Sequence, residues 1–358
     1  MKNTIKVSTP GRICLFGEHQ DYLGLPVIAA AISRRVNIEG GRASSSKATI
    51  HLPDIHRSMN FDIFSEMPYQ SNRDYFRSAL NIMQREGYSF TNGVECTVQG
   101  NIPINSGTSS SSALLANWIH FLSLIADNPK PISPQEIAEI AYRAEVVEFK
   151  EAGGMMDHYS TACGYLIYLQ SVPIIKVDNL KPKLGTFVLG DSQEPKDTVG
   201  LLKRVKGGVL VAIEKIKKEF PEFSISTAKF DDLVSFKHLI TFEEQELISG
   251  NIDNHRILNK ALALLKSDLF DDKDLGELLN QHQFNLKENL KISTPKIDRM
   301  IEACLDSGAL GGKINGSGGG GCMFVYAPDN PEKVARAIEN QGGKAYVITV
   351  DEGTTLDN

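Results

Sequence analysis

The chain lacks the features that mark secreted, membrane and disulfide-rich proteins. Its five cysteines are odd in number and scattered without a C-x-x-C pair, which disfavours a disulfide framework or a zinc site and suits a reducing compartment. No apolar run reaches the roughly 18 residues of a membrane-spanning helix, and the amino terminus lacks the apolar core of a signal peptide. We therefore expect a cytoplasmic protein without a membrane partner.

A basic surface stripe is also missing from the sequence. The net charge is −6, with 38 Lys and Arg against 44 Asp and Glu. The densest basic run, at 214–220, is mixed with acids and has the pattern of the solvent-facing side of a helix. Because nucleic-acid binding needs clustered positive charge, the sequence predicts no nucleic-acid partner.

What the 358 residues do contain is two parts with different patterns. Up to about residue 190, short alternating segments predict strands, and residues 4–17 predict a strand, a turn and a second strand. Beyond that point helical patterns dominate, at 200–219, 242–267, 274–290 and 295–307, followed by strand, helix and strand. This change predicts an α+β protein of two domains, 1–190 and 191–358, that share a cleft.

The clearest helix in the sequence begins after Ser133. Ser133 and Glu136 have the spacing of a capping box, and Pro134 occupies the first helical position. An apolar stripe continues the pattern until Gly153 and Gly154 end it. We therefore expect one helix from Pro134 to the double glycine.

Two glycine-containing stretches predict anion sites. In G-T-S-S-S-S-A-L-L-A-N-W-I, a glycine and four serines lead directly into an apolar helix from about Ser110 to Ala126. A helix start presents unpaired N–H groups and the positive end of the helix dipole, and serine hydroxyls add donors or a metal ligand. The residues alone leave open that the serines merely cap the helix.

The second stretch is a run of five glycines between two apolar strands, namely Gly316, Gly318, Gly319, Gly320 and Gly321. A tight hairpin needs two glycines, and each further glycine loses chain entropy on folding. We therefore expect the backbone to approach a ligand closely there.

Acidic residues supply candidates for a base and a metal ligand. Asp157 follows the double glycine among apolar neighbours, so it is either a catalytic base or a cap of the next helix. Glu145, twelve residues upstream, is a candidate metal ligand, and Glu148, one turn further on, is the alternative.

Arg12, Glu18, His19 and Asp21 gather around a glycine within ten residues. Carboxylates accept hydrogen bonds from hydroxyls, and arginine holds a phosphate or an activated oxygen. The group is typical of a sugar or polyol site, and no second histidine stands at the spacing of a metal ligand. Together these segments supply the parts for phosphoryl transfer to an alcohol.

In their order and spacing, four segments covering nearly the whole chain resemble the GHMP family of small-molecule kinases. P-G-R-I-C-L-F-G-E-H-Q-D-Y looks like the galactokinase signature P-G-R-x-N-L-I-G-E-H-T-D-Y, and P-I-N-S-G-T-S-S-S-S-A is similar to the family's phosphate loop. G-G-M-M-D-H resembles the segment that carries the catalytic Asp in galactokinases, and G-G-K-I-N-G-S-G-G-G-G-C the carboxyl-terminal glycine motif.

The resemblance implies a GHMP kinase fold and a set of residue roles. The first domain would be like ribosomal protein S5 domain 2 and the second ferredoxin-like, with ATP in the cleft. Asp157 would be the base, and Arg12 would stabilise the developing charge. Ser111 and Glu145 would hold Mg²⁺. ATP would bind at Gly107, Thr108, Ser109, Ser110, Ser111, Ser112, Gly318 and Gly319, although Ser112 replaces a family alanine and so also predicts a packing position.

The resemblance also implies the acceptor and the partners. Glu18, His19, Asp21 and Gly154 would face a sugar, phosphorylated at its anomeric hydroxyl. We expect this sugar and ATP as partners, and a monomer or a weak homodimer. The alternatives are a mevalonate kinase, which acts on a carboxylate-bearing alcohol, and a non-catalytic galactokinase-like sugar sensor.

The sequence departs from the galactokinase pattern in ways that bear on the sugar. The segment after residue 190 lacks the tyrosine with which galactokinases meet their sugar, and Gln20 and Thr108 replace family residues. Galactose itself is therefore less favoured than a related sugar. Lys196 in that segment is a candidate contact for an acidic substituent, or else an ordinary solvated lysine.

Overall fold

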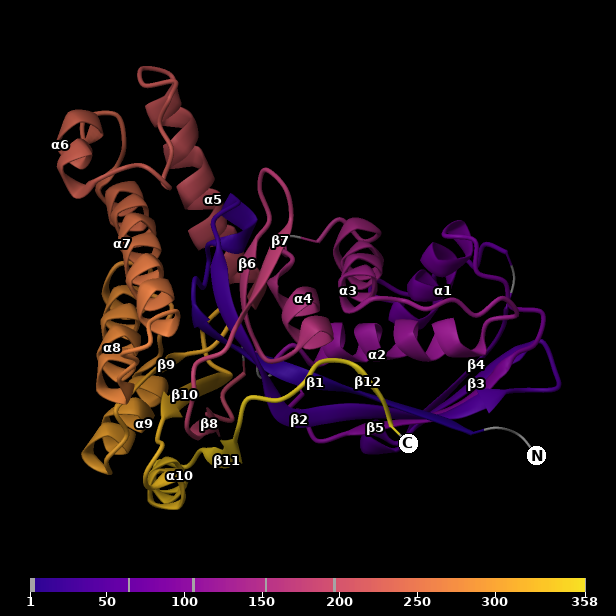
Figure 1. Ribbon diagram of the computed structural model, residues 1–358. Coiled ribbons are helices and arrows are strands. Elements are labelled where there is room, and N and C mark those ends of the chain that lie inside the picture. The colour runs from indigo at the N-terminus through magenta and orange to yellow at the C-terminus, as the bar shows by residue number, and fades with distance from the viewer. Residues whose placement is uncertain (1–3, 64, 105–106, 152, 196–197, 358) are drawn as a thin grey trace.

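The computed structural model describes residues 4–63, 65–104, 107–151, 153–195 and 198–357. Two domains lie side by side in Figure 1, the first in indigo and magenta and the second mostly in orange and yellow. None of the described helices combines the length and apolar character needed to cross a bilayer.

The first domain is built on an eight-stranded sheet in which β1 pairs with β2 along most of its length. The main path of the sheet runs β12-β1-β2-β5-β3-β4, and β6 pairs with β2 and β7. The strands are β1 (Ile5–Phe16), β2 (Val27–Arg42), β3 (Lys47–Leu52), β4 (Arg57–Asp62), β5 (Val94–Gly100), β6 (Leu166–Gln170), β7 (Lys176–Leu180) and β12 (Thr355–Asp357). Their pairings are antiparallel except that of β3 with β5.

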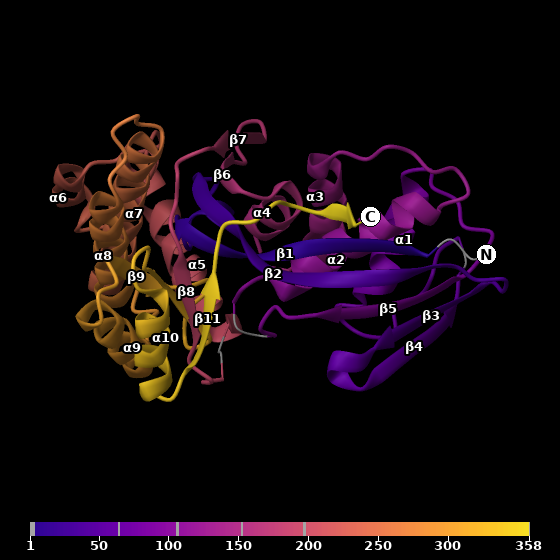
Figure 2. The same cartoon turned by 60° about the horizontal axis from the view of Figure 1, so that its bottom comes forward.

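Helices cover one face of this sheet (Figure 2). They are α1 (Tyr75–Arg85), α2 (Ser110–Ile125), α3 (Pro134–Tyr142) and α4 (Met156–Cys163). Trp118 of α2 lies at the centre of the core beneath them, stacked on Phe121 and edge-on to Phe76. The buried, mostly apolar α2 therefore fixes where its first turn, the serine run, meets the sheet.

The turn expected between Pro10 and Gly11 is wrong, because β1 is one strand through the pair. The strand instead carries an irregularity there, with its register against β2 shifting between Pro10 and Gly11. A Cβ on Gly11 would stand 2.9 Å from the carbonyl oxygen of Thr108, and the N–H of Arg12 donates to that oxygen at 3.1 Å. Gly11 thus serves the close approach of the serine loop, not a turn.

The capping box at Ser133 is confirmed, but the long helix is not. Ser133 Oγ accepts from the N–H of Glu136, and the Glu136 carboxylate accepts from the N–H of Ser133. The α-helix then ends at Tyr142 and continues as one π-helical turn, η3 (Arg143–Val147), closed by the N–H of Glu148 on the carbonyl of Arg143. Such wide turns are frequent at functional sites, and this one carries Glu145.

The second domain packs helices against a four-stranded antiparallel sheet in the order β11-β8-β10-β9. Its strands are β8 (Phe187–Asp191), β9 (Gly311–Ile314), β10 (Cys322–Tyr326) and β11 (Lys344–Ile348). Its helices are α5 (Thr198–Lys217), α6 (Leu233–Phe236), α7 (Phe242–Leu265), α8 (Asp272–Glu288), α9 (Pro295–Asp306) and α10 (Pro331–Asn340). The division at residue 190 stays a prediction: β8 already lies in the second sheet, and β12 returns to the first.

The two domains share an apolar core. Ile13 and Leu15 of β1 and Ile28 of β2 cluster with Leu258 of α7 and Phe324 of β10, all fully buried. This shared core fixes the domains relative to each other on one side of the cleft.

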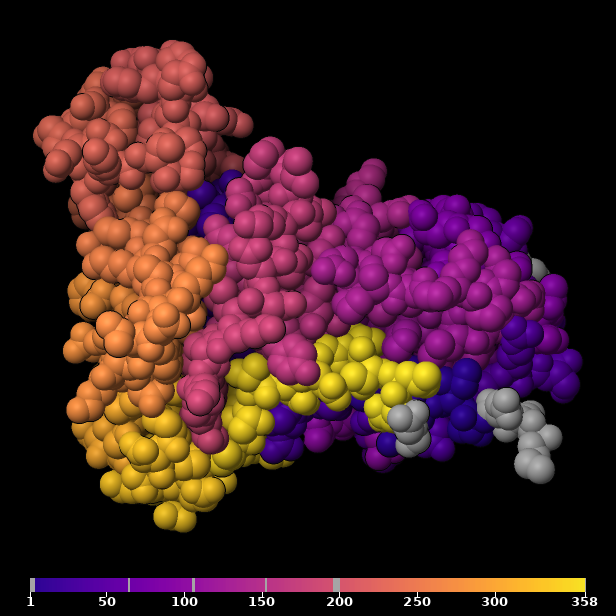
Figure 3. All heavy atoms as spheres, viewed as in Figure 1, coloured from indigo at the N-terminus to yellow at the C-terminus, as the bar shows by residue number. Residues whose placement is uncertain are grey.

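The carboxyl-terminal segment crosses back over the first domain, as the yellow spheres in Figure 3 show. Arg35 of β2 holds it there, donating to the carboxylate of Asp351 at 2.9 Å and to the carbonyl of Gly353 at 2.7 Å. The segment ends in β12, which pairs with β1.

Candidate active site

A cleft of about 1730 Å³ opens between the domains. The first domain contributes the segment around Asp21, the serine loop and the start of α4, and the second contributes α5 and the glycine-rich turn. The motifs singled out in the sequence thus meet in one place, although they are spread over 300 residues of chain.

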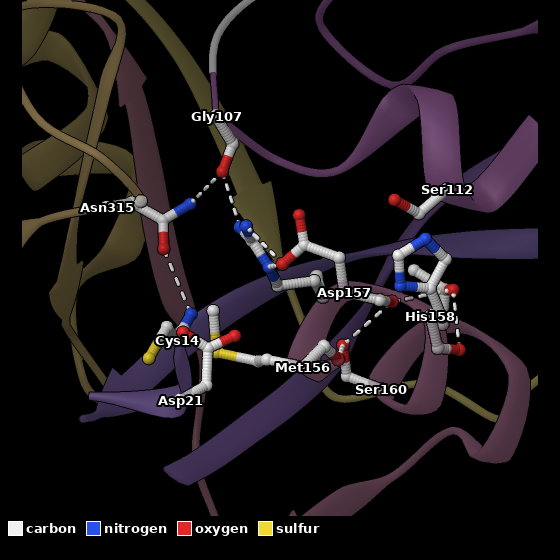
Figure 4. Close-up of polar contacts among 12 residues, drawn as sticks. Cys14, Asp21, Gly107, Ser112, Met156, Asp157, His158, Ser160 and Asn315 are labelled. Carbon is white, nitrogen blue, oxygen red and sulfur yellow. Dashed lines mark hydrogen bonds and ion pairs between the residues drawn. The ribbon is translucent and has the colours of Figure 1, made fainter. Parts of the chain in front are cut away.

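Arg12 and Asp157 both line the cleft and form an ion pair; Figure 4 labels Asp157 and its neighbours. Arg12 Nε and Nη2 donate to the same oxygen of Asp157, Oδ1, at 2.9 and 2.8 Å, and Nη1 donates to the carbonyl of Gly107. The Arg12 side chain is 4% exposed and that of Asp157 33% exposed. Burial acts to raise the pKa of Asp157, but Arg12 first, and His158 and Ser109 besides, outweigh it and lower the pKa below its ordinary value.

Asp21 lies beside this pair, in the 3₁₀ turn η1 (Asp21–Leu23). Its Oδ1 accepts from the N–H of Tyr22 at 2.8 Å. A Cβ on Gly154 would overlap its other oxygen, Oδ2, at 1.9 Å, so the close approach requires glycine. Burial, and then the charge of Asp157, raise the pKa of Asp21 to about 6. The two carboxylates therefore differ in proton affinity although they share one pocket.

The serine loop enters α2 through Ser109, whose φ of +58° is left-handed. Gly107 and Ser109 to Ser112 line the cleft. Thr108 differs, because its hydroxyl donates inward to the carbonyl of Pro103 at 3.2 Å and its side chain is 1% exposed. Only the backbone of Thr108 is therefore placed to contribute to an anion site.

Glu145 is the carboxylate nearest this loop. Its Oε2 accepts from Ser112 Oγ at 2.7 Å and lies 2.8 Å from His158 Nε2. Burial acts to raise the pKa of Glu145, but His158 and the hydroxyls of Ser111 and Ser112 lower it overall, so the group is an anion at neutral pH. A carboxylate beside hydroxyls offers the oxygen ligands that Mg²⁺ prefers.

Two of these contacts extend what the sequence predicts. Ser112, expected as a small packing residue, is a hydrogen-bond donor to the candidate metal ligand. Glu148 points away from the cleft, where its carboxylate pairs with Arg85 at 3.0 Å and accepts from the hydroxyl of Tyr69. Of the two glutamates, the geometry favours Glu145 as the ligand.

Glu18 and His19 lie in the wall between the domains. The carboxylate of Glu18, 1% exposed, pairs with Lys313 Nζ, which also donates to the carbonyls of Cys14 and Ile314 at 2.9 Å. His19 lies 2.8 Å from the Tyr22 hydroxyl and 3.0 Å from the carbonyl of Ser317. Sequence reasoning missed Lys313; the available signal was a lysine within an otherwise small and apolar strand.

The glycine-rich turn reaches the cleft through other glycines than those expected. Gly316, Ser317 and Gly321 contribute to the lining. Gly318 and Gly319 lie behind it against Ile292: a Cβ on Gly318 would stand 2.6 Å from that residue, and the N–H of Gly319 donates to its carbonyl at 2.8 Å. In this structure both glycines pack the turn, and their role at ATP stays a prediction.

The second domain also contributes α5 to the cleft wall, through Lys203, Lys206 and Leu210 among others. Lys196, the residue expected to meet an acidic substituent, lies outside the described residues. Among the described residues, Lys203 and Lys206 place positive charge on this wall, and both belong to α5, the helix that follows Lys196 in the chain.

Comparison with protein families matches three regions of the chain. Residues 74–165 match the model "GHMP kinases N terminal domain", residues 260–344 "GHMP kinases C terminal", and residues 2–42 "Galactokinase galactose-binding signature". Together these matches span more than half of the chain.

Individual relatives fall into two groups. A mevalonate kinase of Thermococcus sibiricus is 27% identical, with 99% of this chain and 98% of the relative covered. A galactokinase of Actinobacillus succinogenes is 26% identical, with 98% and 94% covered. Sequence identity therefore does not separate the two activities.

Solved structures show the same fold. The galactokinase of Lactococcus lactis, complexed with galactose, has a TM-score of 0.85 at 20% identity and covers 99% of this chain, with 95% of its own chain covered. The mevalonate kinase of Methanococcus jannaschii has a TM-score of 0.74 at 19% identity, with 98% and 99% covered.

Proposed function

Since this chain belongs to the GHMP kinase family and has its two-domain fold, we propose that it phosphorylates the anomeric hydroxyl of a galactose-like sugar with Mg-ATP as the donor. The kinase activity follows from the family, whereas the sugar is our inference. The observation that carries the inference about the sugar is the close approach of the Asp21 carboxylate to Gly154, beside the Arg12–Asp157 ion pair.

Asp157 acts as the base in this proposal. As the acceptor oxygen forms its bond to the γ-phosphorus of ATP, the bond to ADP breaks, and the hydroxyl proton passes to the Asp157 carboxylate. Arg12 binds only Oδ1, which leaves Oδ2 for the hydroxyl. A carboxylate of lowered pKa is a weak base, so its main effect is to orient the hydroxyl until the P–O bond to ADP is largely broken.

Asp21 sets the position of the sugar. Its carboxylate accepts hydrogen bonds from two neighbouring hydroxyls, which a sugar ring offers. Gly154 keeps the space above it clear. The proposal therefore places the anomeric carbon over Asp157 and the other hydroxyls toward Asp21.

The phosphates lie in our proposal at the opposite end, along the backbone of Gly107 to Ser112 at the start of α2. Ser111 and Glu145 would hold a magnesium ion, which would supply positive charge to neutralise the phosphates of ATP. Arg12 lies between the proposed acceptor and phosphate positions, so its guanidinium would contact the transferred phosphoryl group.

A panel of acceptors tests the proposal. Galactose, other hexoses, uronic acids and mevalonate are each incubated with Mg-ATP, and ADP release is measured. We expect turnover of a hexose or a hexose derivative. Turnover of mevalonate alone would support the second candidate, a mevalonate kinase, which is considered because the Thermococcus sibiricus mevalonate kinase matches 99% of this chain at 27% identity.

ADP release with any acceptor also separates an enzyme from a non-catalytic sensor. The intact Arg12–Asp157 pair supports an enzyme. The cytoplasmic location, the absence of a nucleic-acid partner and the monomeric or weakly dimeric state stay predictions.

A further inference from the structure

Asn315 links three segments of the active site. It follows β9 at the start of the glycine-rich turn and is fully buried. Its Oδ1 accepts from the N–H of Cys14 in β1, and its Nδ2 donates to the carbonyl of Gly107, both at 2.9 Å (Figure 4). Reversing the amide would set a donor against a donor and an acceptor against an acceptor, so both contacts fix one orientation.

The Gly107 carbonyl that Asn315 holds is also the one that Arg12 Nη1 binds. A carbonyl oxygen has two lone pairs, and here each receives a donor from a different domain. Gly107 has a φ of +91° and lies in the loop before α2, outside the regular hydrogen bonding of a helix or strand. The second domain therefore fixes the peptide on which one end of the Arg12 guanidinium rests.

Cys14 extends the same connection. While Asn315 accepts from its N–H, Lys313 donates to its carbonyl at 2.9 Å, so both peptide groups at Cys14 are bound by side chains of the second domain. Cys14 lies two residues after Arg12 in β1. The second domain therefore acts on Arg12 at two points. Asn315 and Lys313 bind β1 at Cys14, and Asn315 also binds the Gly107 carbonyl that receives the Arg12 guanidinium.

We propose that Asn315 is a positioning residue, which sets the Arg12 guanidinium against Asp157 by fixing the Gly107 carbonyl. The proposal rests on the assigned roles of Arg12 and Asp157 in the proposed kinase reaction. Without Asn315 the Gly107 peptide turns, Arg12 follows it, and the Asp157 oxygen meets the acceptor hydroxyl at a changed angle.

A double-mutant cycle tests this role with any acceptor that the panel identifies. We expect Asn315→Ala to lower kcat by up to about 100-fold, with KM for ATP within about threefold of wild type, because misplacement of a reacting group affects the chemical step. In an Arg12→Ala background, Asn315→Ala should change kcat no more than about twofold, because the two residues act as one unit. Equal losses in both backgrounds would overturn the proposal.

Asn117→Ala is the matched control. Asn117 is also a fully buried asparagine that donates to backbone carbonyls, those of Val7 and Val36, but it lies inside the first domain. Its loss should lower Tm while kcat stays near wild type. Asn315→Thr is the milder second variant; a folded form of it with kcat unchanged would also count against the proposal.

A substrate-free measurement keeps this test separate from the choice of acceptor. Arg12 Nε–H is buried against Asp157 at 2.9 Å, and its ¹⁵N resonance is assigned by its loss in Arg12→Ala. Asn315→Ala should shift this resonance and speed its hydrogen exchange, whereas Asn117→Ala should not. An unchanged resonance would refute the positioning role even if the acceptor proves to be a sugar.

Discussion

The side of the cleft that we propose for the acceptor has the charged side chains Arg12, Asp21 and Asp157, whereas the side proposed for the phosphates offers backbone, serine hydroxyls and Glu145. On the acceptor side the charges set each other: Arg12 lowers the pKa of Asp157, and Asp157 helps to raise that of Asp21. On the phosphate side the proposed contacts come mainly from the start of a helix. In our proposal carboxylates of shifted pKa recognise a hydroxyl and fixed dipoles recognise a phosphate, so the two sides should respond differently to substitution.

The largest effect is expected from removing the base on the acceptor side. Asp157→Asn should lower kcat by about 10²–10⁴-fold, because the variant loses both the group that orients the hydroxyl and the acceptor of its proton, while KM for ATP stays close to wild type. ADP release at saturating substrates measures it. Asp231→Asn, on an exposed surface, is the control, and wild-type activity in Asp157→Asn would remove the proposed mechanism.

Gly154→Ala should affect the acceptor side alone. The new Cβ overlaps Asp21 Oδ2, so KM for the acceptor should rise by roughly 10- to 100-fold, matching the 1–3 kcal/mol of overpacking. Gly207 in α5 also lines the cleft, but a Cβ there meets nothing within 4 Å, so Gly207→Ala is the control for adding a methyl group without a clash. A matching rise in KM for ATP would contradict the separation of the two sides.

Glu145→Gln should act on the phosphate side. We expect the Mg²⁺ concentration for half-maximal activity to rise about tenfold, because a neutral amide is a weaker ligand than a carboxylate. Titrating Mg²⁺ at fixed ATP measures it. Glu148→Gln is the matched control, since that glutamate pairs with Arg85 outside the cleft. Equal effects of both variants would leave Glu145 without a special role.

The smallest effect concerns the stability of the acceptor side. The folded-state pKa of Asp21 is raised to about 6, so its charged form is disfavoured by folding above that pH. Asp21→Asn should therefore raise Tm at pH 7 by about 2–4 °C, the size of a 1 kcal/mol gain in a large domain. The gain should fade as pH drops from about 6 toward 4, because protonation of wild-type Asp21 in the folded state progressively removes the penalty on its charged form. A gain equal at pH 7 and pH 4 would contradict this origin.

Much of the fold and of the site could be predicted from the sequence. The GHMP kinase fold implied by the four motifs is confirmed. Most helices and strands lie where their periodicity indicates, because local capping and apolar stripes determine them. The cleft also brings Arg12, Asp157 and the serine loop together, since these residues stand in motifs that can be recognised locally.

What the sequence could not predict depends on contacts between distant segments. Glu18 and Lys313 stand 295 residues apart, and nothing in either local pattern indicates the other. The glycine run predicts a close approach but not which glycines face the cleft, because Ile292 decides that for Gly318. The π turn at Glu145 likewise depends on α2 and α4, which pair it with Ser112 and His158.

The return of β12 to the first sheet gives the protein an order of assembly. Ribosomes release a chain from its amino terminus, so β1 emerges early and its edge partner β12 only after the whole second domain. During that interval Arg35 has none of the carboxyl-terminal oxygens that it later binds. The edge of β1 is then open to pairing with other chains, and such open edges are a route to misassembly. Pairing with β12 closes this edge, so completion of the first domain depends on synthesis of the second.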